Sequence, residues 1–492
     1  MSSSGQPVLS RRGLLKGGAM LATAGAAPFV QALQALSEAG ASGAAPASRL
    51  ADSPYGPIAP VNDEVTGLPL LQLPAGFSYA SLSWTGDRMS NNSPVPARLD
   101  GMGVVAVQGD EIILIRNHEV GSGALIPAAA CYSSTVRSNG NYAGGGNTTI
   151  RFSRQSKREI STVPSLSGTL VNCAGGVTPW GTWLSCEETI ADLTADGGRK
   201  HGYVFEVRVD PAQTTAVPIV GMGRYDHEAA AVDPRDSSVY LTEDNRNESP
   251  LYRYIPDDKS QTAGALEKGG RLQAAKIVGR GHTELFTPVL GDTHQIEWVD
   301  IADPDMDPVA ESSGPYLQAR DAGALSFSRG EGIWYFEGMF YIVDTSAGTN
   351  EEGRAGYGEG AVWMLDPVAG TLRCIFASTS AEMANNPDNI AISPRGGIAM
   401  CEDGGGVEDA FGFGERIMGL QTSGDSFIFA KNNVVLTAEQ ITAAGKNCEP
   451  GDYRGGELAG VCFDPEGEIM FMNIQNPGVT VAIWGPWERG PL

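Results

Sequence analysis

The stretch Val239-Tyr240-Leu241-Thr242-Glu243-Asp244-Asn245 decides the fold, because a short apolar run ends here in a cluster of carboxylates and amides. Five further apolar runs end in a similar way. They are residues 112–116 before Asn117, His118 and Glu119; 180–185 before Cys186, Glu187 and Glu188; 339–343 before Asp344; 397–400 before Cys401, Glu402 and Asp403; and 469–472 before Asn473, Gln475 and Asn476. Strands that deliver oxygen ligands at their ends, repeated around a ring, predict a β-propeller with cations in its central channel.

Short segments rich in β-branched and aromatic residues recur along the rest of the chain, each bounded by Gly, Pro, Asn or Asp. Residues 203–209, 251–255 and 361–365 read as strands that pack between blades. Helical periodicity is visible in 437–444. We therefore expect an all-β protein with six blades and a metal site in the central channel, in a single domain over residues 48–492. Seven blades or a pair of β-sandwiches are the alternatives.

The composition of the chain indicates which kinds of partner it can bind. The chain has 492 residues with 64 glycines, which suits many strands joined by tight turns, and its formal net charge is −24. Such an acidic balance argues against nucleic acid as a partner, because phosphate backbones are bound by basic patches. It is compatible with binding of hard cations.

The N-terminus carries a targeting signal. Ser10-Arg11-Arg12-Gly13-Leu14-Leu15-Lys16 has the twin-arginine pattern and precedes an Ala/Gly-rich apolar stretch. We assign residues 1–47 to a twin-arginine signal peptide and linker, which makes the export machinery of that route a partner and the location periplasmic or secreted. An amphipathic helix or a membrane span is the alternative reading. No later segment is long and apolar enough to predict a stable span after cleavage.

The acidic clusters include one thiol. The chain has seven cysteines, and Cys186 directly precedes Glu187 and Glu188. Most cysteines are small buried hydrophobes. Carboxylate and amide oxygens suit Ca²⁺, whereas a thiolate among carboxylates favours iron or another transition metal. The residues alone leave these two metals open.

Two His-Glu pairs and one Arg-x-Glu pair complete the candidate site. In Asn117-His118-Glu119 and Tyr225-Asp226-His227-Glu228, adjacent side chains point to opposite faces of a strand, so only one member of each pair can face the channel. We choose Glu119 and Glu228 as ligands and expect hydrogen bonds from the histidines, with histidine ligands as the alternative. Arg329 and Glu331 share a strand face, where Arg329 could clamp a phosphate or form a surface salt bridge.

At these residues the chain resembles the PhoX-type alkaline phosphatases. The matching segments are the twin-arginine signal, 116–119, 183–189, 223–234, 240–254, 329–332 and 386–390. The resemblance implies a six-bladed propeller that hydrolyses phosphate monoesters with ferric and calcium ions. It places an iron-binding cysteine on Cys186, a phosphate-binding arginine on Arg329, a metal-binding glutamate on Glu331 and an iron-site glutamate on Glu228. Calcium ligands would come from Glu119, Glu187, Glu188, Glu243, Asp388, Asn389, Glu402, Asp403 and Asn473.

Two rival functions remain at this point. One is a calcium-dependent propeller hydrolase that acts on lactones or phosphotriesters, which needs no thiolate. The other is a non-catalytic propeller in which calcium only joins the blades and the rim binds a partner. The acidic clusters fit all three functions, and the presence of Cys186 favours the phosphatase.

Overall fold

The computed structural model describes residues 48–421 and 423–492, and the described chain is mostly β. The predicted signal peptide and linker, 1–47, therefore lie outside the described residues. No helix within the described ranges combines the length and apolar character needed to cross a membrane.

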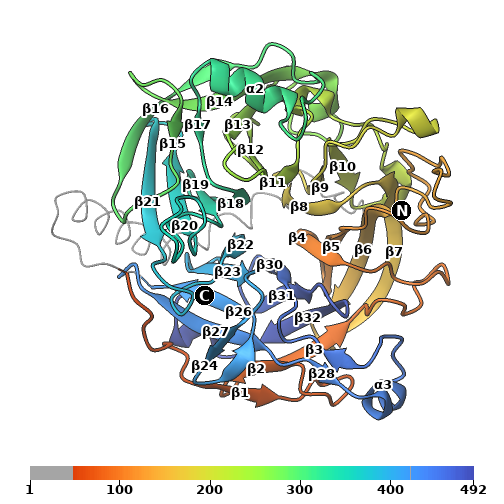
Figure 1. Ribbon diagram of the computed structural model, residues 1–492. Coiled ribbons are helices and arrows are strands. Elements are labelled where there is room, and N and C mark those ends of the chain that lie inside the picture. The colour runs from red at the N-terminus through yellow and green to blue at the C-terminus, as the bar shows by residue number, and fades with distance from the viewer. Residues whose placement is uncertain (1–47, 422) are drawn as a thin grey trace, which may run out of the picture.

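Antiparallel sheets surround a common centre in a propeller-like arrangement (Figure 1). Four groups of strands form separate sheets. The first sheet contains β4 Leu99–Gln108, β5 Glu111–His118, β6 Gly145–Ser153 and β7 Arg158–Thr169, and the second contains β8 Asn172–Val177, β9 Thr182–Glu187 and β10 Val204–Arg208. The third contains β22 Pro387–Ile392, β23 Ile398–Glu402, β26 Arg416–Leu420, β27 Ser426–Asn432, β2 Leu71–Pro74 and β1 Ile58–Val61, and the fourth contains β30 Leu458–Phe463, β31 Ile469–Ile474, β32 Val479–Trp484 and β3 Ser78–Leu82.

Two further groups join into one nine-stranded sheet through the long strand β16. The sheet runs in the order β11 His227–Val232, β12 Val239–Glu243, β13 Leu251–Pro256, β14 Gly270–Ile277, β16 Thr293–Asp300, β21 Thr371–Ala377, β20 Ala361–Asp366, β19 Met339–Asp344 and β18 Gly330–Phe336. β16 pairs with β14 along one part of its length and with β21 along another, so it links the outer edges of two neighbouring groups.

The first strand of each group lies at the centre. β4, β8, β11, β18, β22 and β30 contact one another in that order, and β30 contacts β4, which closes the ring. The same six strands surround the centre of Figure 1. Strands such as β12 and β20 are apolar on both faces because neighbouring sheets cover both.

Segments from the two ends of the chain meet in the outer sheets. β3 pairs with β32, and β2 pairs with β27, so N-terminal strands complete sheets that are built mainly from the C-terminal part. Tyr55, Phe77, Phe429 and Trp487 pack together at this junction. The rings of Phe77 and Trp487 meet edge to face with centroids 4.8 Å apart, and those of Phe429 and Trp487 are stacked. These contacts hold the ring of sheets closed.

Short elements fill the connections. They are the strand pairs β15 Thr283–Glu284 with β17 Leu325–Ser326, β24 Val407–Asp409 with β25 Gly412–Gly414, and β28 Val435–Leu436 with β29 Gly451–Asp452, and the helices α2 Gly314–Asp321 and α3 Ala438–Ala444. The predicted helix over 437–444 is confirmed as α3, which Thr437 and Gln440 cap reciprocally. α2 was not predicted, and Ser313 caps it by accepting from the backbone N–H of Tyr316.

Candidate metal centre

Each of the six central strands begins with the same irregularity. Near its first residues, each of these strands has one residue more than the following strand with which it pairs. This β-bulge occurs in β4, β8, β11, β18, β22 and β30. A bulge of this kind re-aims a side chain out of the regular alternation. The residues that it re-aims are Asp100, Cys173, Glu228, Glu331 and Asp388, with Gly460 at the sixth position.

In four of the six central strands a glycine or alanine follows the re-aimed residue, and these small residues let neighbouring strands approach closely. A Cβ atom on Gly101 would lie 2.5 Å from the Cα of Ala174, and one on Gly332 would lie 2.8 Å from the carbonyl oxygen of Asp388. Residues of all six strands line a cavity of about 30 Å³ at the centre. The close approach brings the side chains from neighbouring strands together.

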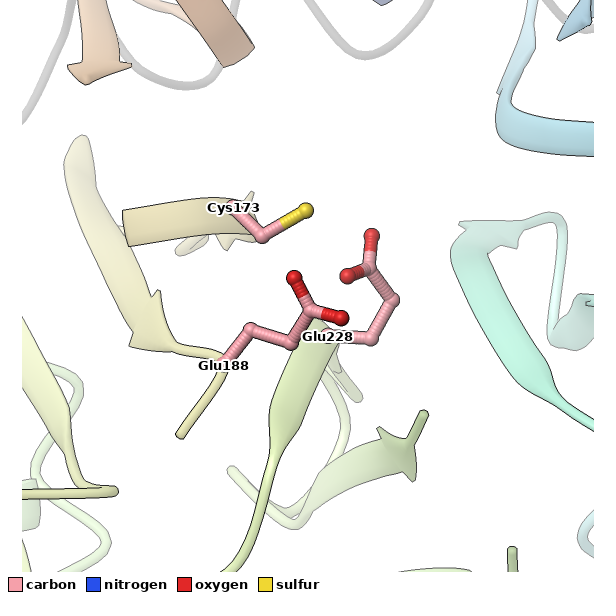
Figure 2. A group of neighbouring side chains, drawn as sticks. All are labelled: Cys173, Glu188 and Glu228. Carbon is pink, nitrogen blue, oxygen red and sulfur yellow. The ribbon is translucent and has the colours of Figure 1, made fainter. Parts of the chain in front are cut away.

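The first group of converging side chains contains a thiol. Ligand atoms of Cys173, Glu188 and Glu228 lie within 4.8 Å of one another, and Figure 2 shows the sulfur and the two carboxylates turned toward a common point. Cys173 and Glu228 are buried and Glu188 is half-buried. Both carboxylate oxygens of Glu228 are buried without a hydrogen-bond partner among the described residues. A buried carboxylate is costly without a partner, so a cation fits this position.

The second group shares Glu228 with the first. Ligand atoms of Glu228, Glu331 and Asp388 lie within 4.8 Å of one another, and all three residues are buried. Arg329 lies beside this group, with its Nη2 3.2 Å from Glu331 Oε1. Its Nε also donates to Asp244 Oδ1 at 2.7 Å, and its Nη2 pairs with Asp244 Oδ2. The guanidinium is therefore held between two carboxylates at the edge of the group.

The third group offers oxygen atoms only. Ligand atoms of Asp100, Glu119 and Glu457 lie within 4.8 Å of one another. Glu119 pairs with Arg98 and accepts from Gln475 Nε2 at 2.8 Å. Cys173 Sγ lies 3.7 Å from Asp100 Oδ1, which connects the third group to the first. An all-oxygen set of this kind suits Ca²⁺.

The acidic side chains of the three groups have raised pKa values, so their ionised forms need positive charge nearby to be stable. Burial, and then the neighbouring carboxylates Glu331 and Asp388, raise the pKa of Glu228 well above its usual range. Burial and Asp403 raise the pKa of Asp388 to about 7. Burial, Asp100 and Glu228 raise the pKa of the Cys173 thiol. Cations would reverse these shifts, because they stabilise the ionised forms that ligate them.

Five of the predicted ligands lie in these groups, namely Glu119, Glu188, Glu228, Glu331 and Asp388. The two histidines make the expected hydrogen bonds: His118 contacts the carbonyl oxygen of Ala97 at 3.1 Å, and His227 that of Gly223 at 3.0 Å.

The structure does not bring Cys186, the predicted iron ligand, to the carboxylates. Leu184 and Cys186 share one face of β9 and pack in a hydrophobic cluster with Val204 and Tyr225. Burial alone raises the pKa of the Cys186 thiol. The cysteine that lies among carboxylates is Cys173, at the bulge of the neighbouring strand β8.

Glu187 and Glu402 also lie outside the groups, because local partners occupy their carboxylates. Glu187 accepts from the backbone N–H groups of Leu170 and Gly202 at 2.8 and 2.9 Å and contacts His201 Nδ1 at 2.6 Å. Glu402 accepts from Nε and Nη2 of Arg416, both at 2.7 Å. These two carboxylates hold neighbouring strands and loops in place.

Four further predicted ligands are not members of the three groups, although three of them, Asn389, Asn473 and Asp403, adjoin residues of these groups. Glu243 Oε2 accepts from the hydroxyl of Tyr252 at 2.6 Å. Asn389 donates to Asp388 at 2.9 Å and accepts from the N–H of Gly460 at 2.6 Å, so it supports a ligand. Asn473 donates to the carbonyl oxygen of Asp100, and Asp403 is exposed.

The sequence did not single out Asp100, Cys173 and Glu457, and it placed Asp244 in the cluster after residues 239–242 without giving it a role. Asp100 and Cys173 stand at the beginnings of first strands and Glu457 directly precedes one, whereas the predicted clusters stand mainly at the ends of second strands. A usable signal exists: Asp100-Gly101, Cys173-Ala174, Glu228-Ala229 and Glu331-Gly332 each place a small residue after the re-aimed side chain.

The chain was compared with protein families, curated proteins and solved structures. A model of the family described as alkaline phosphatase PhoX matches residues 53–478. Comparison with curated proteins finds no match. Among solved structures, the chain is similar to PhoX of Pseudomonas fluorescens in complex with vanadate, a transition state analogue, with a TM-score of 0.58 and 17% identity over 88% of this chain and 99% of that one. A gluconolactonase of Xanthomonas campestris gives a TM-score of 0.34 at 12% identity, over 80% of this chain and 97% of that one, which is too slight to bear on the fold.

Proposed function

Since the chain belongs to the alkaline phosphatase PhoX family and is thereby a phosphoric monoester hydrolase, we propose that it cleaves phosphate monoesters at an iron and calcium centre in the ring of central strands. The observation that carries the proposal is the Cys173–Glu188–Glu228 group, in which both oxygens of the buried Glu228 have no hydrogen-bond partner among the described residues. A thiolate and two carboxylates match the preferences of iron better than those of calcium.

The three groups differ in their ligand atoms and would therefore bind different metals. Cys173, Glu188 and Glu228 would hold iron, and the thiolate assignment thus moves from Cys186 to Cys173. Asp100, Glu119 and Glu457 would hold calcium, because they supply oxygen only. Glu331 and Asp388, with the shared Glu228, would hold a further cation. When bound, such cations neutralise phosphoryl oxygens and activate water.

Arg329 is suited to orient the substrate. Asp244 engages Nε and Nη2 and Glu331 also contacts Nη2, which fixes the plane of the guanidinium. Nη1 is left to donate to an equatorial oxygen of the phosphoryl group. A fixed guanidinium stabilises the charge on those oxygens in the transition state without reorganising first.

We also propose six blades, a single domain over residues 48–492, and export by the twin-arginine route. The closed ring of six first strands supports the blade count. Export to the periplasm or the exterior rests on Ser10-Arg11-Arg12 alone. Replacing Arg11 and Arg12 by lysine should keep the protein in the cytoplasm, and unchanged export would refute the route.

Elemental analysis beside hydrolysis of phenyl phosphate tests the function. Protein purified without chelator should contain iron and calcium, and turnover should be lost on chelation and return when both metals are restored. Calcium without iron and without phosphatase turnover would contradict the proposal and favour a lactonase or a non-catalytic binding propeller.

A further inference from the structure

Two arginines near Arg329 lack a carboxylate partner within 4.0 Å among the described residues. The guanidinium carbons of Arg246 and Arg354 lie 4.5 and 3.6 Å from the ring centroid of Tyr357. Both arginines are exposed, and neither pairs with a carboxylate within 4.0 Å among the described residues. Unpaired arginines gathered on one ring stand out in a chain whose formal net charge is −24.

The chain places this pair next to Arg329. Arg246 follows Asp244, the residue that holds Arg329, by two positions. The backbone N–H of Asn247 donates to the carbonyl oxygen of Ser328 at 2.6 Å, so the loop after β12 lies against the residue preceding Arg329. Partial burial of the guanidinium and then the positive charge of Arg329 lower the pKa of Arg246, and the second cause reflects the proximity of the two arginines.

The arrangement holds like charges together and leaves them available. Arg246 Nη1 donates to the carbonyl oxygen of Gly356 at 3.0 Å, which joins the loop after β12 to the loop that carries Arg354 and Tyr357. The aromatic ring stabilises each guanidinium through its face. Neither contact neutralises the charge, so an anion that binds here relieves the repulsion among three guanidiniums.

We propose that Arg246 and Arg354 form a subsite for a second phosphate group carried by the leaving alcohol, so that the enzyme prefers bisphosphate esters to monophosphate esters of the same alcohol. Guanidinium forks match phosphate oxygens in shape and charge. This inference rests on the proposed function, in which Arg329 and the metal groups hold the reacting phosphate. The subsite selects the substrate and takes no part in bond cleavage.

Binding of ligands that cannot be hydrolysed tests the subsite separately from the phosphatase activity. Calorimetry on the metal-loaded protein compares α,ω-alkane bisphosphonates with monophosphonates of the same chain length, which bind without being hydrolysed. Each exposed guanidinium should contribute about three- to tenfold to the preference for the bisphosphonate, or roughly 10- to 100-fold together. Arg246→Gln and Arg354→Gln should each lose their share, and added salt should reduce the preference.

Arg320→Gln is the matched control, because Arg320 lies over the ring of Tyr316 on α2, 5.8 Å from its centroid, and pairs with Asp321. It should keep the full preference. Equal binding of both ligands by the unmodified protein at every chain length, or an unchanged preference in the double variant, would overturn the subsite. Failure of the unmodified protein to hydrolyse phenyl phosphate would instead overturn the proposed function, and the binding comparison would still decide the subsite.

Discussion

Removing the cations should make the protein less stable as the pH rises, and Asp388 should carry a measurable share of that loss. Asp388 is buried, and burial together with Asp403 raises its pKa from 3.8 to about 7. Between these values the folded protein holds a proton that the unfolded chain has released. Folding is therefore penalised as the pH rises through this window, and the full penalty is present above about pH 7.

The size of the effect follows from the shift. A difference of about three pKa units, at about 1.36 kcal/mol per unit, corresponds to roughly 4 kcal/mol at pH 8. This value is an upper limit for Asp388 alone, because the neighbouring carboxylates contribute to the same electrostatic repulsion. Asp388→Asn removes the charge and keeps an oxygen that can accept from Asn389, so the metal-free variant should be more stable than the unmodified protein at pH 8.

Urea denaturation of the metal-stripped proteins at pH 5 and pH 8 measures this difference. Asp388→Asn should gain a few kcal/mol at pH 8 and less at pH 5, and added calcium should still stabilise it through Asp100, Glu119 and Glu457. Asp321→Asn, at a mostly exposed carboxylate on α2, should change neither value. A metal-free Asp388→Asn protein that is no more stable than the unmodified one at pH 8 would show that the carboxylates do not repel as the geometry requires.

Three further changes probe other parts of the structure. Asp244→Asn should loosen Arg329 and raise KM for phenyl phosphate about tenfold while the metal content stays unchanged, and loss of iron instead would make Asp244 a ligand. Gly101→Ala should destabilise the protein by about 1–3 kcal/mol in thermal or urea unfolding, because the new methyl group meets the backbone of Ala174; an unchanged midpoint would show that the central strands can move apart. Glu402→Gln should cost about 3–5 kcal/mol of stability, because it removes the closer of the two carboxylates that pair with the buried Arg416 and leaves only Asp409 at 3.8 Å. The folded fraction should nevertheless keep its full metal content by elemental analysis.

The repeated strand pattern was readable in the sequence, because the strand ends recur with a regular chemistry. The alternation rule also selected Glu119 and Glu228 over their histidine neighbours. Applied consistently, it would have separated Glu187 from Glu188 and Glu402 from Asp403, since adjacent side chains of a strand rarely reach the same point.

The bulges could not be read in the same way. A bulge is set by pairing between strands, and it moves Cys173 and Asp100 into positions that a regular strand would not give them. The choice between Cys186 and Cys173 also depends on tertiary packing, because both lie on short buried strands. The arrangement of the neighbouring sheets places Cys186 among apolar side chains and Cys173 among carboxylates.

The iron content of two matched cysteine variants tests the central claim most directly. Cys173→Ala and Cys186→Ala each remove a buried thiol from a neighbouring strand, and elemental analysis of the folded proteins reads the result. Cys173→Ala should lose iron and phosphatase turnover while keeping calcium at Asp100, Glu119 and Glu457, and Cys186→Ala should keep both metals. Iron retained in Cys173→Ala and lost in Cys186→Ala would contradict the assignment of the metal centre.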